Sequence, residues 1–515
     1  MTAIDWSVMG AYLIGMLALA LWIGRSQRSS DDYFLGGQTL SSGSLAASTI
    51  ATQCSTNSLL GAPAFVGFTV GGGLVWLQYE LAVPLAMAAL LWLLIPARRS
   101  ASASVYGILE TELGRSSRLV ASGCFLLFRG VATGVTIYGV SLVLALILEV
   151  SYTTAVFLLM AVTIVYDLLG GLRAVVVSDV IQLILLTVTV LISLTLLVDT
   201  HGWEQLFADR TTVLVNDWGM AGNSYGFWPM LIGGFFLYTA YYGCDQSQAQ
   251  RVLAAGSEQG SQRVLLLNGL CRFPLVLAYC LLGLGLAAYA SSSPEFIAAL
   301  PTTSGGTPNF NLVFPTYVLR EFGVGFVGLI MVGLVAAAMS SIDSAINSLS
   351  AATVEDFVRP RRPELTSSQA LLWSRATTLA WGLFAIAFSF QVESIAPTVL
   401  EAINKIGSMA NGPLLALFCL ALLLRGVAQS AALAGFATGI AGNLILAFAA
   451  PQVSWLWWNP FGFAIAFGTA IGLTLLNGQP LTRRTYEGPP LGGYVGILLV
   501  AAILILAICW GLDRL

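Results

Sequence analysis

One apolar stretch of this chain holds a dense group of side chains that could bind an ion. Residues 335–350 read VAAAMSSIDSAINSLS, so hydroxyls, one carboxylate and one amide recur along a segment that otherwise suits a membrane helix. Oxygen atoms of this kind are the ligands that a hard cation needs once it has lost its water. Because each unsatisfied polar group in a membrane costs several kcal/mol, the cluster predicts a bound ion or a polar partner.

The same hydroxyls have a second interpretation. They could bond back to carbonyls of their own helix, or hold that helix against a neighbour. A lone serine is usually explained in this way. Here Ser340, Ser341, Asp343 and Ser344 lie close together, and Asn347 follows one turn later. We favour the ion-binding interpretation, and the structural one stays open.

The composition indicates an integral membrane protein. Hydrophobic residues make up 57% of the chain and charged residues only 9%, and the mean hydropathy is +0.84. We expect a single transmembrane domain over residues 1–515, with about fourteen apolar stretches long enough to span a bilayer. Most arginines between these stretches fall on one side, and only Arg210, Arg320 and Arg514 fall on the other. The positive-inside rule then predicts a multi-pass protein of the plasma (inner) membrane with both termini extracytoplasmic.

Two of the expected spans are interrupted by polar residues. The first interruption reads TQCSTNS at residues 52–58, and the second reads YTAYYGCDQ at residues 238–246. Unwound backbone at such points would offer free carbonyls to a cation and helix N-termini to an anion. A polar helix face that packs against neighbouring helices is the alternative for each segment taken alone.

The two interrupted spans also divide the chain. Each opens a group of five expected spans, over residues 45–198 and 227–424, and the third span of each group is long, near 117–148 and 320–350. Two halves of opposite topology that each begin with a broken helix are typical of inverted-repeat transporters. The predicted fold is therefore an all-α membrane protein with a five-plus-five inverted repeat.

Other classes of membrane protein are disfavoured. The chain has no GxxxxGK[ST] loop, so we do not expect ATP-driven pumping by this chain alone. It has no filter-like loops or charge rings of a channel, and only about four residues follow the last expected span, where a sensor would need a signalling domain. It also shows no metal-ligand spacing or catalytic triad, so we predict that it is not an enzyme.

Several motifs resemble those of the sodium/solute symporter family, which includes sodium-coupled carriers of sugars, proline, sialic acid, monocarboxylates, vitamins and iodide. The resemblance covers residues from about 30 to about 425. In chain order its landmarks are DYFLGG at 32–37, YDLLGGLRAV at 166–175, SDVIQ at 178–182, Asp245-Gln246 with Gln250-Arg251, MSSIDS at 339–344, and Gly412-Pro413.

This resemblance implies the leucine-transporter-like fold and a sodium-coupled secondary active symporter. Such a protein would import a small organic solute by alternating access, as a functional monomer in the lipid bilayer, with no nucleic-acid partner. Sodium would be co-transported.

The resemblance also implies a sodium site between the first broken helix and the span near 320–350. Its ligands would be three carbonyl oxygens and two hydroxyls, from Ala51, Cys54, Ala337, Ser340 and Ser341.

Some members of the family hold a second sodium. The matching positions here are Asp179, Ser340, Asp343 and Ser344. Asp343 departs from the Ser or Thr of those members, so a second site stays open.

The expected substrate-binding residues are Gln53, Ser55, Ser58, Glu80, Arg129, Tyr238, Tyr241 and Lys405. Among the positions that sugar carriers of the family use, only Glu80 matches. Ser58, Lys405 and Tyr238 replace the Gln, Gln and Asn of those sugar carriers, and Tyr241 lies where the family has an aromatic inner gate.

Two cations in these spans suggest the charge of the solute. Arg129 lies about one turn from the position at which sialic acid carriers have an arginine, near Ala132, and Lys405 lies in a substrate-lining span. We therefore predict a small organic anion such as sialic acid or a monocarboxylate, because a carboxylate needs a cation. If Lys405 pairs with Glu401 and Arg129 with Glu80, the pocket is neutral, and the alternative is a glucose- or galactose-like sugar.

Overall fold

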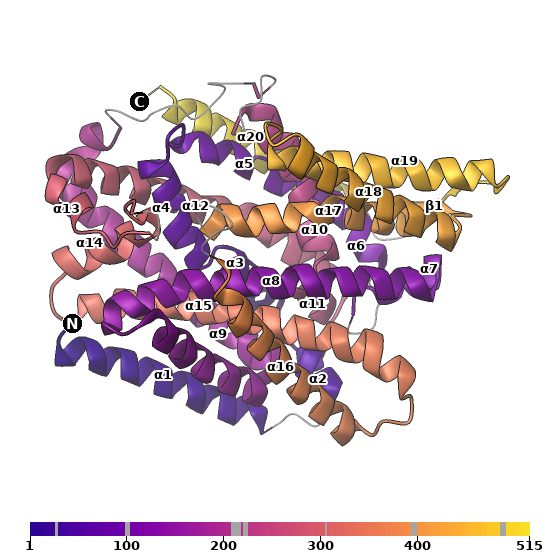
Figure 1. The fold of residues 1–515 in the computed structure, drawn as a ribbon, viewed down its shortest axis with the longest axis horizontal. Helices are drawn as coiled ribbons and strands as arrows, with labels where there is room; N and C mark the ends of the chain where they lie inside the picture. The colour runs from indigo at the N-terminus through magenta and orange to yellow at the C-terminus, as the bar shows by residue number, and fades with distance from the viewer. Residues whose placement is uncertain are drawn as a thin grey trace.

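The chain is almost entirely helical in a computed structural model that describes residues 1–25, 29–97, 104–207, 218–219, 225–303, 306–392, 399–484 and 491–514. Within these residues, 11 helices are long and apolar enough to cross a membrane. Figure 1 shows the long helices α1, α8, α15 and α19 running in a similar direction, with short helices between them. A two-stranded antiparallel ribbon joins β1 (Leu424–Arg425) to β2 (Thr482–Arg483).

The continuous long helices, in chain order, are α1 (Ala3–Gly24), α6 (Ala82–Ala97), α8 (Arg115–Leu148), α9 (Tyr152–Phe207), α12 (Glu258–Ser292), α15 (Phe326–Ala352), α16 (Ser367–Ser389), α17 (Val399–Leu423), α18 (Gln429–Ala449), α19 (Trp458–Leu476) and α20 (Gly492–Leu512). Shorter helices include α2 (Ser30–Leu35), α5 (Leu77–Glu80), α7 (Gly107–Leu113), α13 (Pro294–Ala298) and α14 (Val313–Glu321).

The first interrupted span is a pair of short helices. α3 (Ser42–Gln53) ends at Cys54, which has φ −85° and ψ 54°, and α4 (Thr56–Phe68) begins after the extended residue Ser55. The predicted break is present, but it is narrower than the polar run at 52–58, because most of those polar residues remain helical.

The second interrupted span breaks at one residue. α10 (Gly234–Cys244) and α11 (Gln246–Ala254) are separated by Asp245, whose backbone is extended with φ −79° and ψ 121°. The carboxylate of Asp245 accepts a hydrogen bond from the backbone N–H of Ser247 at 2.8 Å, so it caps α11. The expected break is present at Asp245, and the aromatic residues before it continue the helix.

Two expected spans, near 152–170 and 175–198, form one kinked helix. α9 bends at Gly171, which has φ 53° and ψ −169°. Positive φ is accessible to glycine at little cost, so the GG pair of the YDLLGG segment lets the helix change direction. About fourteen spans are expected, and the structure has 11 continuous helices of this kind among the described residues. The merger into α9 and the two broken spans account for the difference.

α15 lies at the centre of the molecule. In the segment Phe326–Arg361, 89% of the most apolar 18 residues are buried, whereas the corresponding fraction in α20 is 17%. A helix buried on all sides has no surface for lipid, so its polar residues must face other helices. The hydroxyl-rich segment of α15 packs against α3 and α9, and thus against the first broken helix.

Candidate functional site

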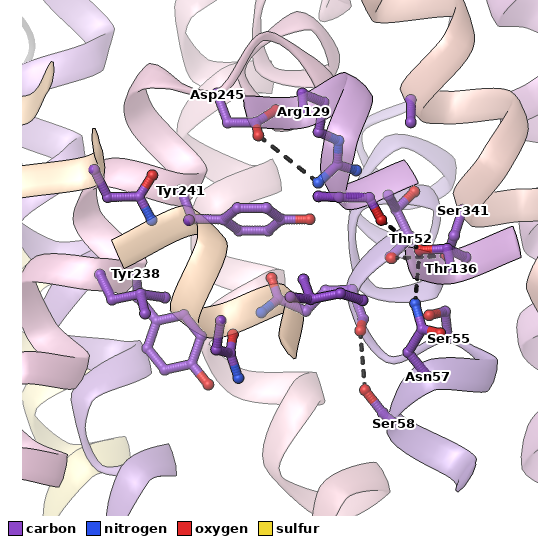
Figure 2. A pocket seen from close by; sticks show the side chains of 18 of the residues that line it. Thr52, Ser55, Asn57, Ser58, Arg129, Thr136, Tyr238, Tyr241, Asp245 and Ser341 are labelled. Carbon is purple, nitrogen blue, oxygen red and sulfur yellow. Dashed lines mark hydrogen bonds and ion pairs between the residues drawn. The ribbon is translucent and has the colours of Figure 1, made fainter. Parts of the chain in front are cut away.

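A cavity of about 130 Å³ lies between the two broken helices. Its walls come from the α3–α4 break, α5, α8, α10, α12, α15 and α17, so both halves of the chain contribute. Figure 2 shows Arg129 and Asp245 at one end of the cavity and Ser58 and Asn57 at the other, with the ring of Tyr241 beside Arg129.

Most of the residues expected to bind substrate line this cavity. These are Gln53, Ser55, Ser58, Glu80, Arg129, Tyr238 and Tyr241.

Lys405 differs from the other expected residues. It is half-buried and is not among the lining residues, although Ile403, Asn404 and Gly407 of the same helix are. Helical periodicity explains this, since α17 turns a different face to the cavity. The expected pair with Glu401 lies outside the side chains that the structure describes.

Arg129 has an acidic neighbour that we did not expect. Its Nη1 lies 3.7 Å from Oδ2 of Asp245, and its guanidinium carbon lies 5.7 Å from the ring centroid of Tyr241. The alternative in which Arg129 pairs with Glu80 is wrong, because Glu80 pairs with Arg272 instead. The Arg129 Nε has no hydrogen-bond partner among the described residues, so the guanidinium keeps donor capacity towards a solute.

Glu80 pairs instead with Arg272 of α12. Nη2 of Arg272 donates to Oε1 of Glu80 at 2.9 Å and to the hydroxyl of Tyr238 at 2.8 Å. The guanidinium also stacks at 4.4 Å from the Tyr238 ring centroid. Arg272 was missed, although an arginine in the middle of an apolar span is itself a signal of a functional site or a buried partner.

Several buried polar atoms in the cavity wall have no hydrogen-bond partner among the described residues. They are Oε1 of Gln53, Oδ1 of Asn57, the hydroxyl of Tyr79, Oε2 of Glu80, Nε of Arg129, and Nε and Nη1 of Arg272. Buried polar atoms are normally paired, so these acceptors and donors are available to a polar solute. The cavity suits a molecule that carries both hydrogen-bond donors and an acceptor or anionic group.

The residues of the expected sodium site all lie buried where α15 meets the first break. The hydroxyl of Ser341 donates to the carbonyl of Thr52 at 3.1 Å, as Figure 2 shows. The carbonyl of Cys54 accepts from the hydroxyl of Tyr279 at 2.9 Å, and Ser340 donates to Asp179. The structure thus brings both serines to the break. That all five oxygens coordinate one sodium ion stays a prediction.

The expected second sodium set is also buried, but it contains a residue that we did not foresee. Nη2 of Arg251 lies 3.1 Å from Oδ2 of Asp179, and it donates to Ser344 as well. Neither oxygen of Asp343 has a hydrogen-bond partner among the described residues. The Gln250-Arg251 pair was noted only as a motif, since nothing in the sequence says which helix an arginine faces.

Comparison with known proteins identifies relatives of this architecture. A family model described as "Sodium:solute symporter family" matches residues 33–439. The chain is 26% identical over 449 residues to the sodium/sialic acid symporter NanT of Aliivibrio fischeri, covering 84% of this chain and 85% of that protein. It is 29% identical over 452 residues to sodium-coupled monocarboxylate transporter 1 of Mus musculus, covering 85% and 72%.

Solved structures share the fold. A Na⁺-coupled sialic acid symporter in a substrate-bound outward-open state superposes with a TM-score of 0.83 at 22% identity, covering 92% of this chain and 98% of that one. The nucleobase-cation-symport-1 family transporter Mhp1 superposes with a TM-score of 0.53 at 14% identity, covering 88% and 96%.

Proposed function

Since this chain belongs to the sodium:solute symporter family, we propose that it imports a small organic anion together with sodium, by alternating access. The observation that supports this most directly is the polar cavity between the two broken helices, which is lined by Arg129, whose Nε has no hydrogen-bond partner among the described residues. Sodium and the solute are both cargo in this scheme, and the protein is a transporter and not an enzyme.

The architecture that we propose has about fourteen transmembrane spans. Residues 45–198 and 227–424 form two repeats of five spans, each opened by a broken helix, at Cys54–Ser55 and at Asp245. In such folds substrate and ion bind at the repeat interface near mid-membrane, and one repeat moves against the other. The position of the cavity between the two breaks supports this assignment.

Sodium binding would connect the first break to α15. We propose as ligands the carbonyls of Ala51, Cys54 and Ala337 and the hydroxyls of Ser340 and Ser341. The existing bond from Ser341 to the Thr52 carbonyl shows that the two elements are already within reach. Sodium would then strengthen this contact, and each ion moving down a 100 mV potential would supply about 2.3 kcal/mol to transport.

The charge of the solute follows from unequal pairing of the two arginines. The charge of Arg272 is compensated by the carboxylate of Glu80 at 2.9 Å, although its Nε and Nη1 have no hydrogen-bond partner among the described residues. Arg129 is 3.7 Å from Asp245, beyond hydrogen-bond distance. A carboxylate could form a charge-assisted hydrogen bond with Arg129. The similarity to a sialic acid and a monocarboxylate symporter agrees with an anion.

A neutral sugar is the second candidate. The cavity wall contains Glu80 and Asp245 as well as Arg129 and Arg272, so its formal charges cancel. The unpaired oxygens of Gln53 and Asn57 would accept from sugar hydroxyls.

Matched solute pairs in proteoliposomes decide between the two candidates. We expect sodium-dependent uptake of a carboxylic acid or sialic acid, and much weaker uptake of the corresponding amide or parent sugar. Arg129→Gln should raise the KM for the acid at least tenfold, since a lost charge-assisted bond costs about 1.5–3 kcal/mol. Better uptake of the neutral member, unaffected by Arg129→Gln, would overturn the anion assignment.

A further inference from the structure

Helix α17 contains a proline in the middle of its membrane-spanning length. Pro413 has no backbone N–H, and in a regular helix that N–H would donate to the carbonyl of Met409, four residues earlier. A backbone carbonyl without a partner is strongly unfavourable inside a membrane. The Met409 carbonyl therefore needs a donor from outside its own helix.

The donor comes from the neighbouring helix α18. Nδ2 of Asn443 donates to the carbonyl of Met409 at 3.0 Å and to that of Ser408 at 3.3 Å. Asn443 is fully buried, and its Oδ1 has no hydrogen-bond partner among the described residues, so the amide is used as a donor. Its two acceptors are the carbonyls that the N–H groups of residues 412 and 413 would bind in an uninterrupted helix.

A second amide reaches the same turn from α19. Nδ2 of Asn459 donates to the Ser408 hydroxyl at 2.9 Å, and both residues are fully buried. A Cβ at Gly412 would clash with the Asn459 carbonyl, and a Cβ at Gly462 would clash with the amide of Asn443. The absence of these side chains lets α18 and α19 approach the interrupted turn, and Figure 1 shows both helices beside α17.

The other face of this segment of α17 lines the cavity. Gly407, Ala410, Asn411 and Leu414 are lining residues, and their three- and four-residue spacing places them on one side of the helix. The carbonyls that Asn443 binds belong to the turn between Gly407 and Asn411. The position of that turn therefore determines where the cavity face of α17 lies.

We propose that Asn443 is a positioning residue for solute binding: its amide replaces the hydrogen bond that Pro413 removes from α17, and so fixes the cavity face of that helix. The inference rests on the proposed symport function. It gives α18, which lies beyond the two proposed repeats, a part in forming the cavity. Asn459 supports the same turn through Ser408, and neither asparagine is among the residues that line the cavity.

The test combines removal of the donor with restoration of the backbone N–H. Asn443→Leu keeps a similar volume and lacks the amide, so the KM for uptake into proteoliposomes should rise about tenfold, as for one buried acceptor left without a partner. Pro413→Ala returns the N–H to α17, so Asn443→Leu should have a much smaller effect in that background. Sialic acid and lactate are the solutes used.

Two controls distinguish positioning from general damage. Thr438→Val, also in α18, removes a hydroxyl that bonds to the carbonyl of Gly435 in its own helix, and it should leave the KM unchanged. Equilibrium binding of ²²Na⁺ without solute should be the same in Asn443→Leu as in the wild type, because α17 and α18 carry none of the proposed sodium ligands.

Three results would overturn the inference. They are an unchanged KM in Asn443→Leu, an equal effect of this substitution with and without Pro413, and a loss of sodium binding as large as the loss of solute binding. If Asn443→Leu does not fold, Asn443→Leu/Pro413→Ala should fold because the carbonyl regains its helical donor. Failure of both variants to fold would count against the inference as well.

Absence of uptake of both acids by the wild type would contradict the proposed solute class, and labelling then decides the inference. Asn411→Cys places a thiol on the cavity face of α17, and its reaction rate with a methanethiosulfonate reagent is measured above the background of the parent protein. Asn443→Leu should change this rate when Pro413 is present and not in the Pro413→Ala background. Equal rates in all four proteins would show that Asn443 does not position this face.

Discussion

At the scale of single residues, the two serines of α15 allow the sodium site to be tested. Ser340→Ala/Ser341→Ala removes two of the five proposed ligands, and we expect at least a tenfold loss of sodium affinity with the fold retained. Ser348→Ala is the matched control, because the Ser348 hydroxyl bonds to the carbonyl of Ala345 in its own helix. Sodium titration of uptake, with thermal stability measured alongside, checks this. Unchanged sodium affinity in the double variant would exclude the site.

The buried pair of Glu80 and Arg272 makes a second prediction at this scale. Removing one partner of a buried ion pair leaves an uncompensated charge and costs about 3–5 kcal/mol. We therefore expect Arg272→Gln to lower the thermal stability in detergent strongly, and Glu80→Gln/Arg272→Gln to recover part of the loss. If the double variant is less stable than Arg272→Gln, the charges of Glu80 and Arg272 do not compensate each other in the folded protein.

At the scale of elements, the kink of α9 depends on Gly171. At φ 53° and ψ −169° a residue with a side chain costs about 1–3 kcal/mol, so Gly171→Ala should lower the melting temperature. The same kink precedes Asp179, so solute uptake should fall as well. Gly496→Ala in α20 is the control, because a Cβ there meets nothing within 4 Å. Equal melting temperatures for the two variants would show that α9 does not require glycine at the bend.

At the scale of the whole molecule, the distribution of arginines predicts the orientation. Both termini should be extracytoplasmic, so a cysteine at Thr2 or Asp513 should react with a membrane-impermeant maleimide in intact cells. A cysteine at Arg362, in the arginine-rich connection between α15 and α16, should react only after the cells are permeabilised. The reverse pattern would invert the predicted orientation.

The sequence alone determined the class of the protein and the elements of its site. Hydropathy indicated a multi-span membrane protein, the polar runs near Cys54 and Asp245 indicated two broken helices, and the hydroxyls of α15 indicated an ion site. These properties are local, since apolar length, helix breakers and polar atoms in an apolar segment act within one element. The match to the family model over residues 33–439 agrees with the class of the protein, and the ion site stays a prediction.

Only the tertiary structure decided which charges meet. Arg272 pairs with Glu80 across 192 positions, Arg251 reaches Asp179 across 72, and Arg129 faces Asp245 instead of Glu80. Helical periodicity states which residues share a face, but not which neighbouring helix that face meets. The charge balance of the cavity and of the Arg251 cluster therefore depends on how the helices pack.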